Sequence, residues 1–304
     1  MEPLVLKTNA LTKKYKNQIA VDNISITIEK GDIFGLIGLN GAGKTTLMRL
    51  ITALTFADSG EMEILGERTP QGLMKARERI GCIIETPAFY KNLTAIENLE
   101  YYRIQRGIPE KKLVFDVLKL VELEDNDKKK YKNFSLGMKQ RLGLALAILN
   151  HPDFIILDEP INGLDPVGIV EMREIIKKLN KEGITILISS HILSELSMVA
   201  TKYGIIHHGK LIKEITDEEL KENCKRSILI KVDDSQKAVV ILETVLHTLK
   251  YKVTGTGELR IYDYLDNPSE VAGALFSKGI KVSGIQEIGD NLEDYFRTLI
   301  GEGK

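Results

Sequence analysis

Three glycines, one lysine and two threonines stand close together in the stretch GLNGAGKTT, Gly38 to Thr46. Gly38, Gly43, Lys44 and Thr45 match the spacing G-x-x-x-x-G-K-[ST]. This spacing lets backbone N–H groups converge on one anion, and the start of a following helix adds partial positive charge. Lys44 would neutralise the β and γ phosphates of a nucleotide, and the Thr45 hydroxyl would ligate Mg²⁺. A glycine-rich turn without a ligand is the alternative. The residues that complete the predicted phosphate loop are Asn40, Gly41, Ala42 and Thr46.

Two adjacent acids follow a short apolar run in FIILDEP. A buried strand that ends in Asp158 and Glu159 needs a cation nearby, because carboxylates are costly to desolvate without one. We expect Asp158 to contact Mg²⁺ through water, and Glu159 to orient or deprotonate the water that attacks the γ phosphate. The alternative is that the two acids only cap the following turn.

Two kinds of strand pattern surround these residues. Alternation of apolar and polar residues predicts half-buried strands, whereas continuous apolar runs predict parallel strands that are covered on both faces. Between about residues 93 and 149, apolar residues recur at every third or fourth position, so helices are expected to interrupt the sheet. The sequence therefore predicts an α/β fold with a mixed and largely parallel sheet and a helical insert. The strands expected are residues 4–9, 24–28, 32–37, 154–157 and 184–189.

The character of the sequence changes after Asp217. The pattern that follows is strand, helix, strand, strand, helix, strand, which is the order of a ferredoxin-like α+β domain, with a last amphipathic helix in NLEDYFRTLIGEG. Since 304 residues tend to split into two cores, we expect one domain at 1–217, with its helical insert at about 90–150, and an accessory domain at 218–304. The elements expected in the accessory domain are residues 227–232, 236–249, 251–255, 258–262, 268–278 and 280–286.

Composition argues against several classes of protein. The net charge of −1 gives no electrostatic reason to expect a nucleic acid partner. The apolar runs are shorter than the roughly 18 residues that a bilayer span requires, and the first residues lack the pattern of a secretory signal. Cys82 and Cys224 have no His or Cys neighbours at ligand spacing, so neither a disulfide framework nor a zinc site is expected.

The stretch NFSLGMKQR, residues 133–141, adds a further motif. Together with the phosphate loop, with DEP followed by NGLDP, and with His191 after ITILISS, it resembles the nucleotide-binding subunit of ABC transporters over about residues 4–217. The resemblance implies the P-loop NTPase fold of the ABC ATPases, with ATP and Mg²⁺ as cofactors. It also implies that Ser135 and Gly137 begin a helix whose N-terminus faces the γ phosphate held by a partner chain. A homodimer that closes head to tail on binding ATP, and a separate transmembrane permease, follow from the same resemblance.

The resemblance assigns roles to three more residues. Tyr15 matches the aromatic residue that stacks on adenine, and His191 matches the switch histidine that contacts the γ phosphate and joins Glu159 in catalysis. Asp165, in NGLDP, matches the loop that touches the partner's site. Without the resemblance, Tyr15 is equally a surface or core aromatic, a lone histidine after a strand is usually structural, and Asp165 is a turn residue before Pro166.

Two departures from the family pattern occur. Glu85 stands where the family usually has Gln, and a carboxylate can reach Mg²⁺ through oxygen but brings a charge and no amide donor. Leu136 replaces the first glycine of the signature, and Met138 replaces the following glutamine. These changes, with ETPAFYKNLTAIENL, most resemble the bacitracin and lantibiotic group of ABC exporters.

In that group, residues 86–98 lie where the ATPase subunit meets its permease, so Pro87, Phe89 and Tyr90 are candidate docking residues. A local hydrophobic staple is the alternative. The expected function is ATP hydrolysis that drives export of a peptide antibiotic or similar drug, by a cytoplasmic subunit held on the inner face of the membrane through its permease.

A different class is an ABC-type ATPase that acts as a regulatory module without a permease, in translation or DNA repair. Such proteins usually carry two ATPase cassettes or a long coiled-coil insert, and neither pattern is present in these 304 residues. A small-molecule kinase would share the phosphate loop but would need neither the signature nor the histidine.

Overall fold

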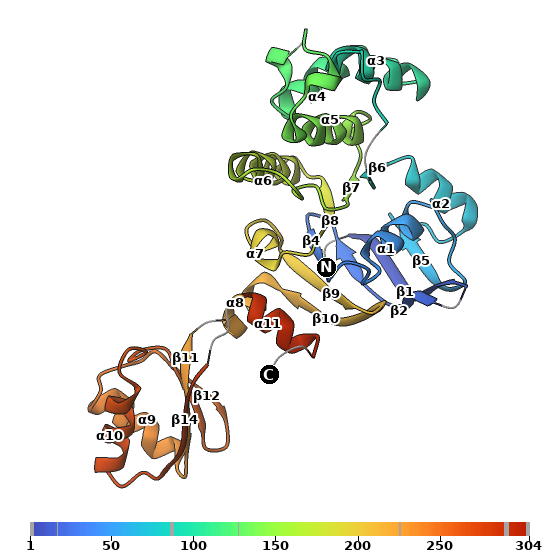
Figure 1. The fold of residues 1–304 in the computed structure, drawn as a ribbon. Helices are drawn as coiled ribbons and strands as arrows, with labels where there is room; N and C mark the ends of the chain where they lie inside the picture. The colour runs from blue at the N-terminus through green and yellow to red at the C-terminus, as the bar shows by residue number, and fades with distance from the viewer. Residues whose placement is uncertain are drawn as a thin grey trace. The chain divides into compact units, whose positions relative to one another are not determined.

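The computed structural model describes residues 3–16, 18–85, 88–126, 128–224, 226–288 and 292–301. The chain divides into two compact units, Met1–Asp217 and Glu218–Lys304. Figure 1 shows the elements of both. None of the helices in the described ranges has the length and the apolar character that a bilayer crossing requires.

The first unit begins with an antiparallel sheet in which β1 pairs with β2, β3 and β5. β1 is longer than the strand predicted from alternation, and the predicted strand at 24–28 is divided between two elements. The cause is Thr8, whose hydroxyl donates to the carbonyl of Ile24 and accepts from the amide of Ile26, both at 3.0 Å. A side chain thus occupies ladder positions and ends β2. The four strands are Leu4–Tyr15, Gln18–Ile24, Thr27–Glu29 and Ser59–Ile64.

A six-stranded sheet with the order β10-β9-β4-β8-β7-β6 forms the centre of the first unit. Five of its strands run parallel, and only β10 is antiparallel to its neighbour. Every residue of β4, β7 and β8 is buried, as continuous apolar runs predict. The predicted mixed sheet is therefore confirmed. In chain order these strands are Ile33–Ile37, Ile80–Ile83, Phe154–Leu157, Thr185–Ser190, Lys202–His207 and Lys210–Thr216.

Helices pack against this sheet, and one of them, α1, begins within the predicted phosphate loop. Leu47 and Met48 of α1 are fully buried in a core that also contains Leu6 of the antiparallel sheet and Leu36 of the six-stranded sheet. One hydrophobic core therefore joins the two sheets through α1. The helices that follow strands of the first unit are α1 (Lys44–Ile51), α2 (Pro70–Arg77), α6 (Pro166–Lys181) and α7 (Leu193–Leu196).

Three further helices occupy the stretch predicted to interrupt the sheet, between β6 and β7. They are α3 (Ala95–Gln105), α4 (Leu113–Leu120) and α5 (Leu136–Ile148), and Figure 1 shows them gathered in one cluster. Two short 3₁₀ turns, Glu124–Asn126 and Tyr131–Asn133, connect α4 to α5. The second turn leads directly to Ser135, so the helical cluster holds the predicted signature.

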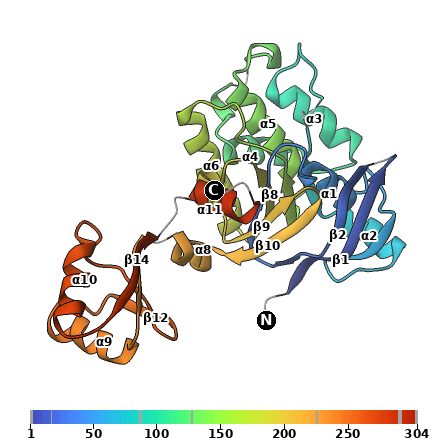
Figure 2. The ribbon, with the colours of Figure 1, turned by 60° about the horizontal axis from the view of Figure 1, so that its bottom comes forward.

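The second unit contains a four-stranded antiparallel sheet with the order β12-β13-β11-β14. Both views in Figures 1 and 2 show α9 and α10 on the same side of this sheet, and their apolar residues form one core with β11 and β13. α9 ends at Thr244 rather than at the predicted residue 249. The elements from residue 217 on are α8 (Asp217–Cys224), β11 (Ser227–Val232), α9 (Ser235–Thr244), β12 (Tyr251–Gly255), β13 (Glu258–Ile261), α10 (Pro268–Ser277), β14 (Val282–Ile288) and α11 (Leu292–Leu299).

Candidate functional site

The phosphate loop connects β4 to α1, and glycine is required at both of its ends. A Cβ on Gly38 would lie 2.4 Å from the carbonyl oxygen of Ile206. A Cβ on Gly43 would lie 2.3 Å from the carbonyl oxygen of Ala20, and Gly43 has a φ of 109°, which only glycine adopts without strain. The backbone is therefore packed as a tight turn that ends at the first residue of α1. The amides of Gly38 and Ala42 donate to the carbonyls of Ser190 and Leu39, whereas the helix N-terminus that follows is suited to bind an anion.

Lys44 places one positive charge inside this turn. Its side chain is only 6% exposed, and its Nζ donates to the carbonyl oxygen of Gly38 at 2.6 Å. The same Nζ lies 3.2 Å from Oε1 of Glu159. A buried ammonium group needs a negatively charged or hydrogen-bonding partner. The Lys44 side chain is therefore positioned to bind an anionic ligand.

A second group of oxygens lies beside the start of α1. The Thr45 hydroxyl donates to Oδ2 of Asp158 at 2.7 Å, and the Ser189 hydroxyl donates to Oδ1 at 2.6 Å. Hydroxyl and carboxylate oxygens are the ligands that Mg²⁺ prefers, so the donor set fits this ion. In the described part of the chain no group of three His, Cys, Asp or Glu residues could hold a metal by itself. A magnesium ion at Thr45 and Asp158 would therefore need water and phosphate oxygens to complete its coordination.

Glu159 and His191 face each other at the ends of adjacent strands. His191 Nδ1 lies 2.8 Å from Glu159 Oε2, and the backbone amide of Glu159 donates to the Ser189 hydroxyl at 2.9 Å. Glu159 has a φ of 49°, a conformation that non-glycine residues rarely adopt outside functional turns. Its buried Oε1 is close to Lys44 but is not aligned for a hydrogen bond. At 3.2 Å the two groups form an ion pair, and Oε1, which accepts no hydrogen bond from the described residues, can accept a proton.

Lys44, Thr45 and Glu159 line a cavity of about 340 Å³ together with Tyr15. The Tyr15 ring is 44% exposed, and Lys13 Nζ lies 5.4 Å from its centre. A half-exposed ring at the rim of a phosphate-binding cavity has one face available for stacking on a base. The structure thus brings together residues that the sequence analysis selected from three separate motifs. The residues that line this cavity are Tyr15, Gln18, Ala20, Asn40, Gly41, Ala42, Gly43, Lys44, Thr45, Thr46 and Glu159.

Glu85, a predicted metal contact, forms an ion pair with an arginine of α1. Its carboxylate pairs with the guanidinium of Arg49, in the last turn of α1, and its side chain is 65% exposed. The residue also has a φ of 65°. Asp158, by contrast, bonds to Thr45 and Ser189. Glu85 is thus paired with Arg49, which follows Thr45 by four residues in α1.

Ser135, Gly137 and Asp165 lie outside this cavity. The Ser135 hydroxyl caps α5 by accepting from the amide of Met138 at 3.2 Å, and Asp165 caps α6 by accepting from the amide of Gly168 at 3.1 Å. A Cβ on Gly137 would have an ordinary contact, 3.8 Å from Leu164, so space is available at the start of α5. Ser135 and Asp165 each cap the start of a helix, and neither lines the cavity that contains the phosphate loop.

The candidate docking residues differ from the prediction. Phe89 is only 8% exposed, with its ring 5.1 Å from that of Tyr131. It is a core residue of the helical cluster, and its selection as an exposed anchor was wrong. Tyr90 is 49% exposed and stays a candidate. Pro87 lies outside the described residues.

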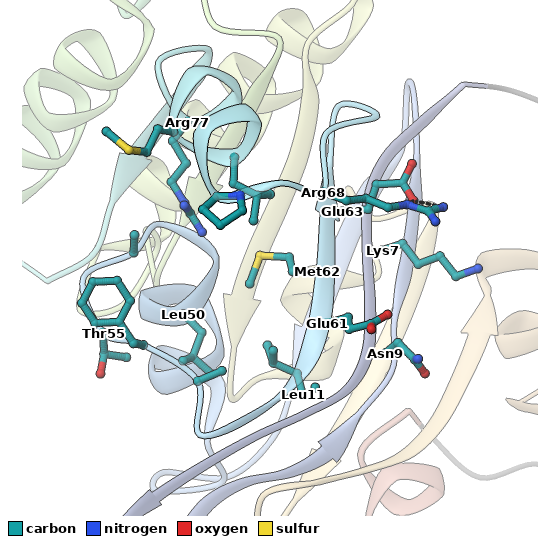
Figure 3. A pocket seen from close by; sticks show the side chains of 17 residues that line it. Lys7, Asn9, Leu11, Leu50, Thr55, Glu61, Met62, Glu63, Arg68 and Arg77 are labelled. Carbon is teal, nitrogen blue, oxygen red and sulfur yellow. Dashed lines mark hydrogen bonds and ion pairs between the residues drawn. The ribbon is translucent and has the colours of Figure 1, made fainter.

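A larger hollow, of about 1090 Å³, lies elsewhere in the first unit, between β1, β5, α1 and α2 (Figure 3). Its wall includes Leu11, Leu50 and Met62, and Arg68 at its edge is paired with Glu63. Partial burial lowers the pKa of Arg77 in the same wall. Because this hollow contains no part of the phosphate loop, its size does not identify the nucleotide site. The phosphate loop and its buried Lys44 identify that site instead.

The phosphate loop, the buried Lys44 and the carboxylates of Asp158 and Glu159 after a buried strand define a nucleoside triphosphatase of the phosphate-loop class. The chain matches the model of the ABC transporter family over residues 21–162. It is 45% identical to the bacitracin transport ATP-binding protein BcrA of Bacillus licheniformis, over 98% of each chain. It is also 43% identical to the lantibiotic transport ATP-binding protein SrtF of Streptococcus pyogenes, over 75% of this chain and 99% of that one.

A solved dimeric ATP-binding cassette, in a post-hydrolysis state with ADP and Pi, superposes with a TM-score of 0.63 at 26% identity. The superposition covers 70% of this chain and 98% of the cassette. The chain therefore belongs to the ATP-binding proteins of ABC transporters and is an ATPase.

Sequence reasoning missed Gln18 and Ala20 of the cavity lining, and it missed Ser189, which supports both acids of the site. Its hydroxyl is fully buried and joins the Asp158 carboxylate to the Glu159 backbone. The available signal was the pair of hydroxyls that ends the apolar run ITILISS just before His191.

Proposed function

We propose that this ATPase energises a separate transmembrane permease, which exports a peptide antibiotic or a similar drug. The names of BcrA and SrtF, a bacitracin and a lantibiotic transport protein, support this choice of cargo. Since cargo contacts the permease and not the ATPase, the subunit would lie in the cytoplasm on the inner face of the membrane.

The observation that carries the proposal is the junction of two small networks at one cavity. Lys44, Glu159 and His191 form one, and Thr45, Asp158 and Ser189 form the other. The first would bind the γ phosphate and accept the proton of the attacking water, and the second would hold Mg²⁺. The ion, when bound, would neutralise charge on the phosphate oxygens.

The residues have separate tasks in hydrolysis. Glu159 would accept a proton at a carboxylate oxygen while the water oxygen attacks the γ phosphorus and the bond to the β-phosphate oxygen breaks. His191, which lies 2.8 Å from the other carboxylate oxygen, would keep that side chain directed at the water. Lys44 would offset the charge that the leaving ADP acquires. Glu85 remains a proposed metal contact that would first have to leave Arg49.

We further propose that two copies close head to tail on ATP. Ser135 and Gly137 stand at the start of α5, where a Cβ on Gly137 would make only an ordinary contact with Leu164, and a helix N-terminus favours an anion. The γ phosphate of a partner would meet this helix start, with Asp165 nearby. The second unit would be a ferredoxin-like accessory domain, a proposal supported by its antiparallel sheet and by the β-α-β-β-α-β order of β11 to β14 along the chain.

Replacing Glu159 by Gln tests the proposal. The variant removes the proton acceptor but keeps the size of the side chain, so we expect ATP binding to persist and hydrolysis to fall by roughly 100-fold or more. ATP without turnover should then hold the variant as a dimer in sedimentation experiments. A monomer at micromolar protein concentration with saturating ATP would contradict the shared site. Purification from membranes together with a permease would separate a transporter subunit from a soluble regulator.

A further inference from the structure

We infer that Tyr131 is a positioning residue for the phosphate contact at Ser135, and that it acts through rings shared with Phe89 and Phe134. These rings fix the start of α5 to the loop formed by residues 88–94, called the 88–94 loop below. The inference rests on the proposed role of Ser135 at the partner's γ phosphate. The 88–94 loop and the start of α5 would then move together as one rigid body.

Backbone hydrogen bonds already join the two segments. The amide of Tyr131 donates to the carbonyl of Leu93 at 2.9 Å, and the amide of Lys132 donates to the carbonyl of Lys91 at 3.0 Å. Thr94 and Lys130 form an isolated antiparallel bridge beside them. These contacts connect positions about 40 residues apart in the sequence, so the 88–94 loop has a fixed register on the segment that leads to Ser135.

Aromatic rings carry this register to the helix start. The Tyr131 ring centre lies 5.1 Å from that of Phe89 and 5.8 Å from that of Phe134, with both pairs tilted at 52°. All three residues are at most 8% exposed. Phe134 directly precedes Ser135, the residue that caps α5. Packed rings have few alternative arrangements, so a shift of Phe89 has to displace Phe134 and the cap.

A buried asparagine holds the other end of the arrangement. Asn98, which is fully buried in α3, accepts from the amide of Tyr90 at 2.8 Å and donates to the carbonyls of Tyr90 and Thr94 at 3.2 and 2.8 Å. The hydroxyl of Tyr102, one helical turn further along α3, donates to the carbonyl of Ala88. A buried amide with its groups satisfied rigidifies the segment around it. The 88–94 loop is therefore fixed to α3 as well as to Ser135.

The consequence concerns dimer formation rather than nucleotide binding by one copy. The cavity that holds nucleotide in each chain contains neither Tyr131 nor Phe89. Loss of the ring contacts should leave that cavity intact and make only the position of Ser135 less fixed. A residue that merely stabilises the helical cluster would not separate these two quantities.

The experiment uses the full chain with Glu159→Gln as the parent. Tyr131→Leu removes both ring contacts, and we expect ATP-driven dimerisation to weaken by about tenfold, because each aromatic pair contributes a fraction of that factor. ADP affinity of the monomer should not change. Tyr131→Phe keeps the ring and should restore dimerisation. Phe134→Leu, in which Tyr131 is intact, should repeat the effect even where Tyr131→Leu folds poorly.

Leu118→Ala is the matched control, since Leu118 is a buried residue of α4 in the same helical cluster. It should lower the thermal midpoint as much as Tyr131→Leu does while leaving dimerisation at the parental value. Equal dimerisation of Tyr131→Leu, Phe134→Leu and the parent would overturn the inference, and so would an equal loss in Leu118→Ala. A parent that stays monomeric would instead remove the proposed shared site and this inference with it.

Discussion

At the scale of single residues, the site depends on a serine that makes no predicted contact with substrate. Ser189 donates to Asp158 and accepts from the Glu159 amide, so it sets the position of the expected metal contact and of the catalytic carboxylate together. We expect Ser189→Ala to lower ATP turnover and to cost about 1–3 kcal/mol of stability, because a buried amide loses its acceptor. ATPase assays and denaturant unfolding measure the two effects.

Ser190→Ala is the control for this prediction. Ser190 is equally buried and accepts from the amide of Ile192, but its hydroxyl contacts neither acid of the site. We expect a similar loss of stability with a smaller loss of turnover. If the two variants lose turnover equally, Ser189 has only a structural role.

Glu85 offers a second test at this scale. Replacing it by Gln removes a negative charge and its pairing with Arg49, which as an exposed ion pair contributes little to stability. If Glu85 contacts the metal during turnover, the variant should require more Mg²⁺ for half-maximal ATPase activity, because an amide oxygen binds the ion more weakly than a carboxylate. Unchanged magnesium dependence would assign Glu85 no metal role.

The site residues that were selected from the sequence and those that were missed differ in the range of their contacts. The phosphate loop could be recognised from the sequence because its motif occupies nine consecutive residues. The backbone geometry of these residues alone forms the expected phosphate-binding turn. The bonds of Ser189 join residues 30 and 31 positions apart, and no local pattern records such a pairing. Phe89 was misjudged for the same reason, since the ring that buries it comes from Tyr131.

At the scale of elements, the cap of α3 is a test of local physics. The Thr94 hydroxyl accepts from the amide of Glu97, and the Glu97 carboxylate accepts from the amide of Thr94, which together form a capping box. Thr94→Ala should cost about 0.5–2 kcal/mol in the free energy of unfolding. It should also weaken ATP-driven dimerisation, because Thr94 ends the 88–94 loop.

Thr69→Ala provides the comparison for that cap. Thr69 caps α2 by accepting from the amide of Gly72 at 3.1 Å, and α2 is remote from Ser135 in the sequence. A similar loss of stability without a change in dimerisation is expected. Should both caps affect dimerisation alike, the effect belongs to general stability and not to the 88–94 loop.

Element type was predictable where burial is uniform, and element ends were not. The run FIIL gave β7 at its observed bounds, because a strand covered on both faces is apolar throughout. The end of β2 was missed, since the hydroxyl of Thr8 replaces backbone partners there. α9 stops at Thr244, well short of the apolar pattern that continues to Leu249. Periodicity identifies the buried face of an element, whereas side-chain hydrogen bonds and tertiary contacts determine where it stops.

At the scale of the whole molecule, all residues of the nucleotide cavity come from the first compact unit. The relative SrtF is aligned over 99% of its length by only 75% of this chain. An alignment of 230 residues must lie mostly within Met1–Asp217, because the second unit holds only the remaining residues. About a quarter of this chain therefore has no counterpart in SrtF.

This division leads to a prediction for a chain cut after Cys224. The cut keeps α8 whole and with it Asp217, which accepts from the hydroxyl of Tyr203 at 3.0 Å. We expect the shortened chain to bind ADP with the affinity of the full chain, because both cavity networks remain. Titration calorimetry of the two chains compares these affinities directly. ATP-driven dimerisation of the shortened chain, measured in the Glu159→Gln background, then separates two roles of the second unit. An unchanged dimer would show that the second unit takes no part in dimer closure. A weaker dimer with unchanged ADP affinity would show that it contributes directly to closure. Loss of ADP binding would contradict the prediction, since the first unit would then depend on the second for its own fold.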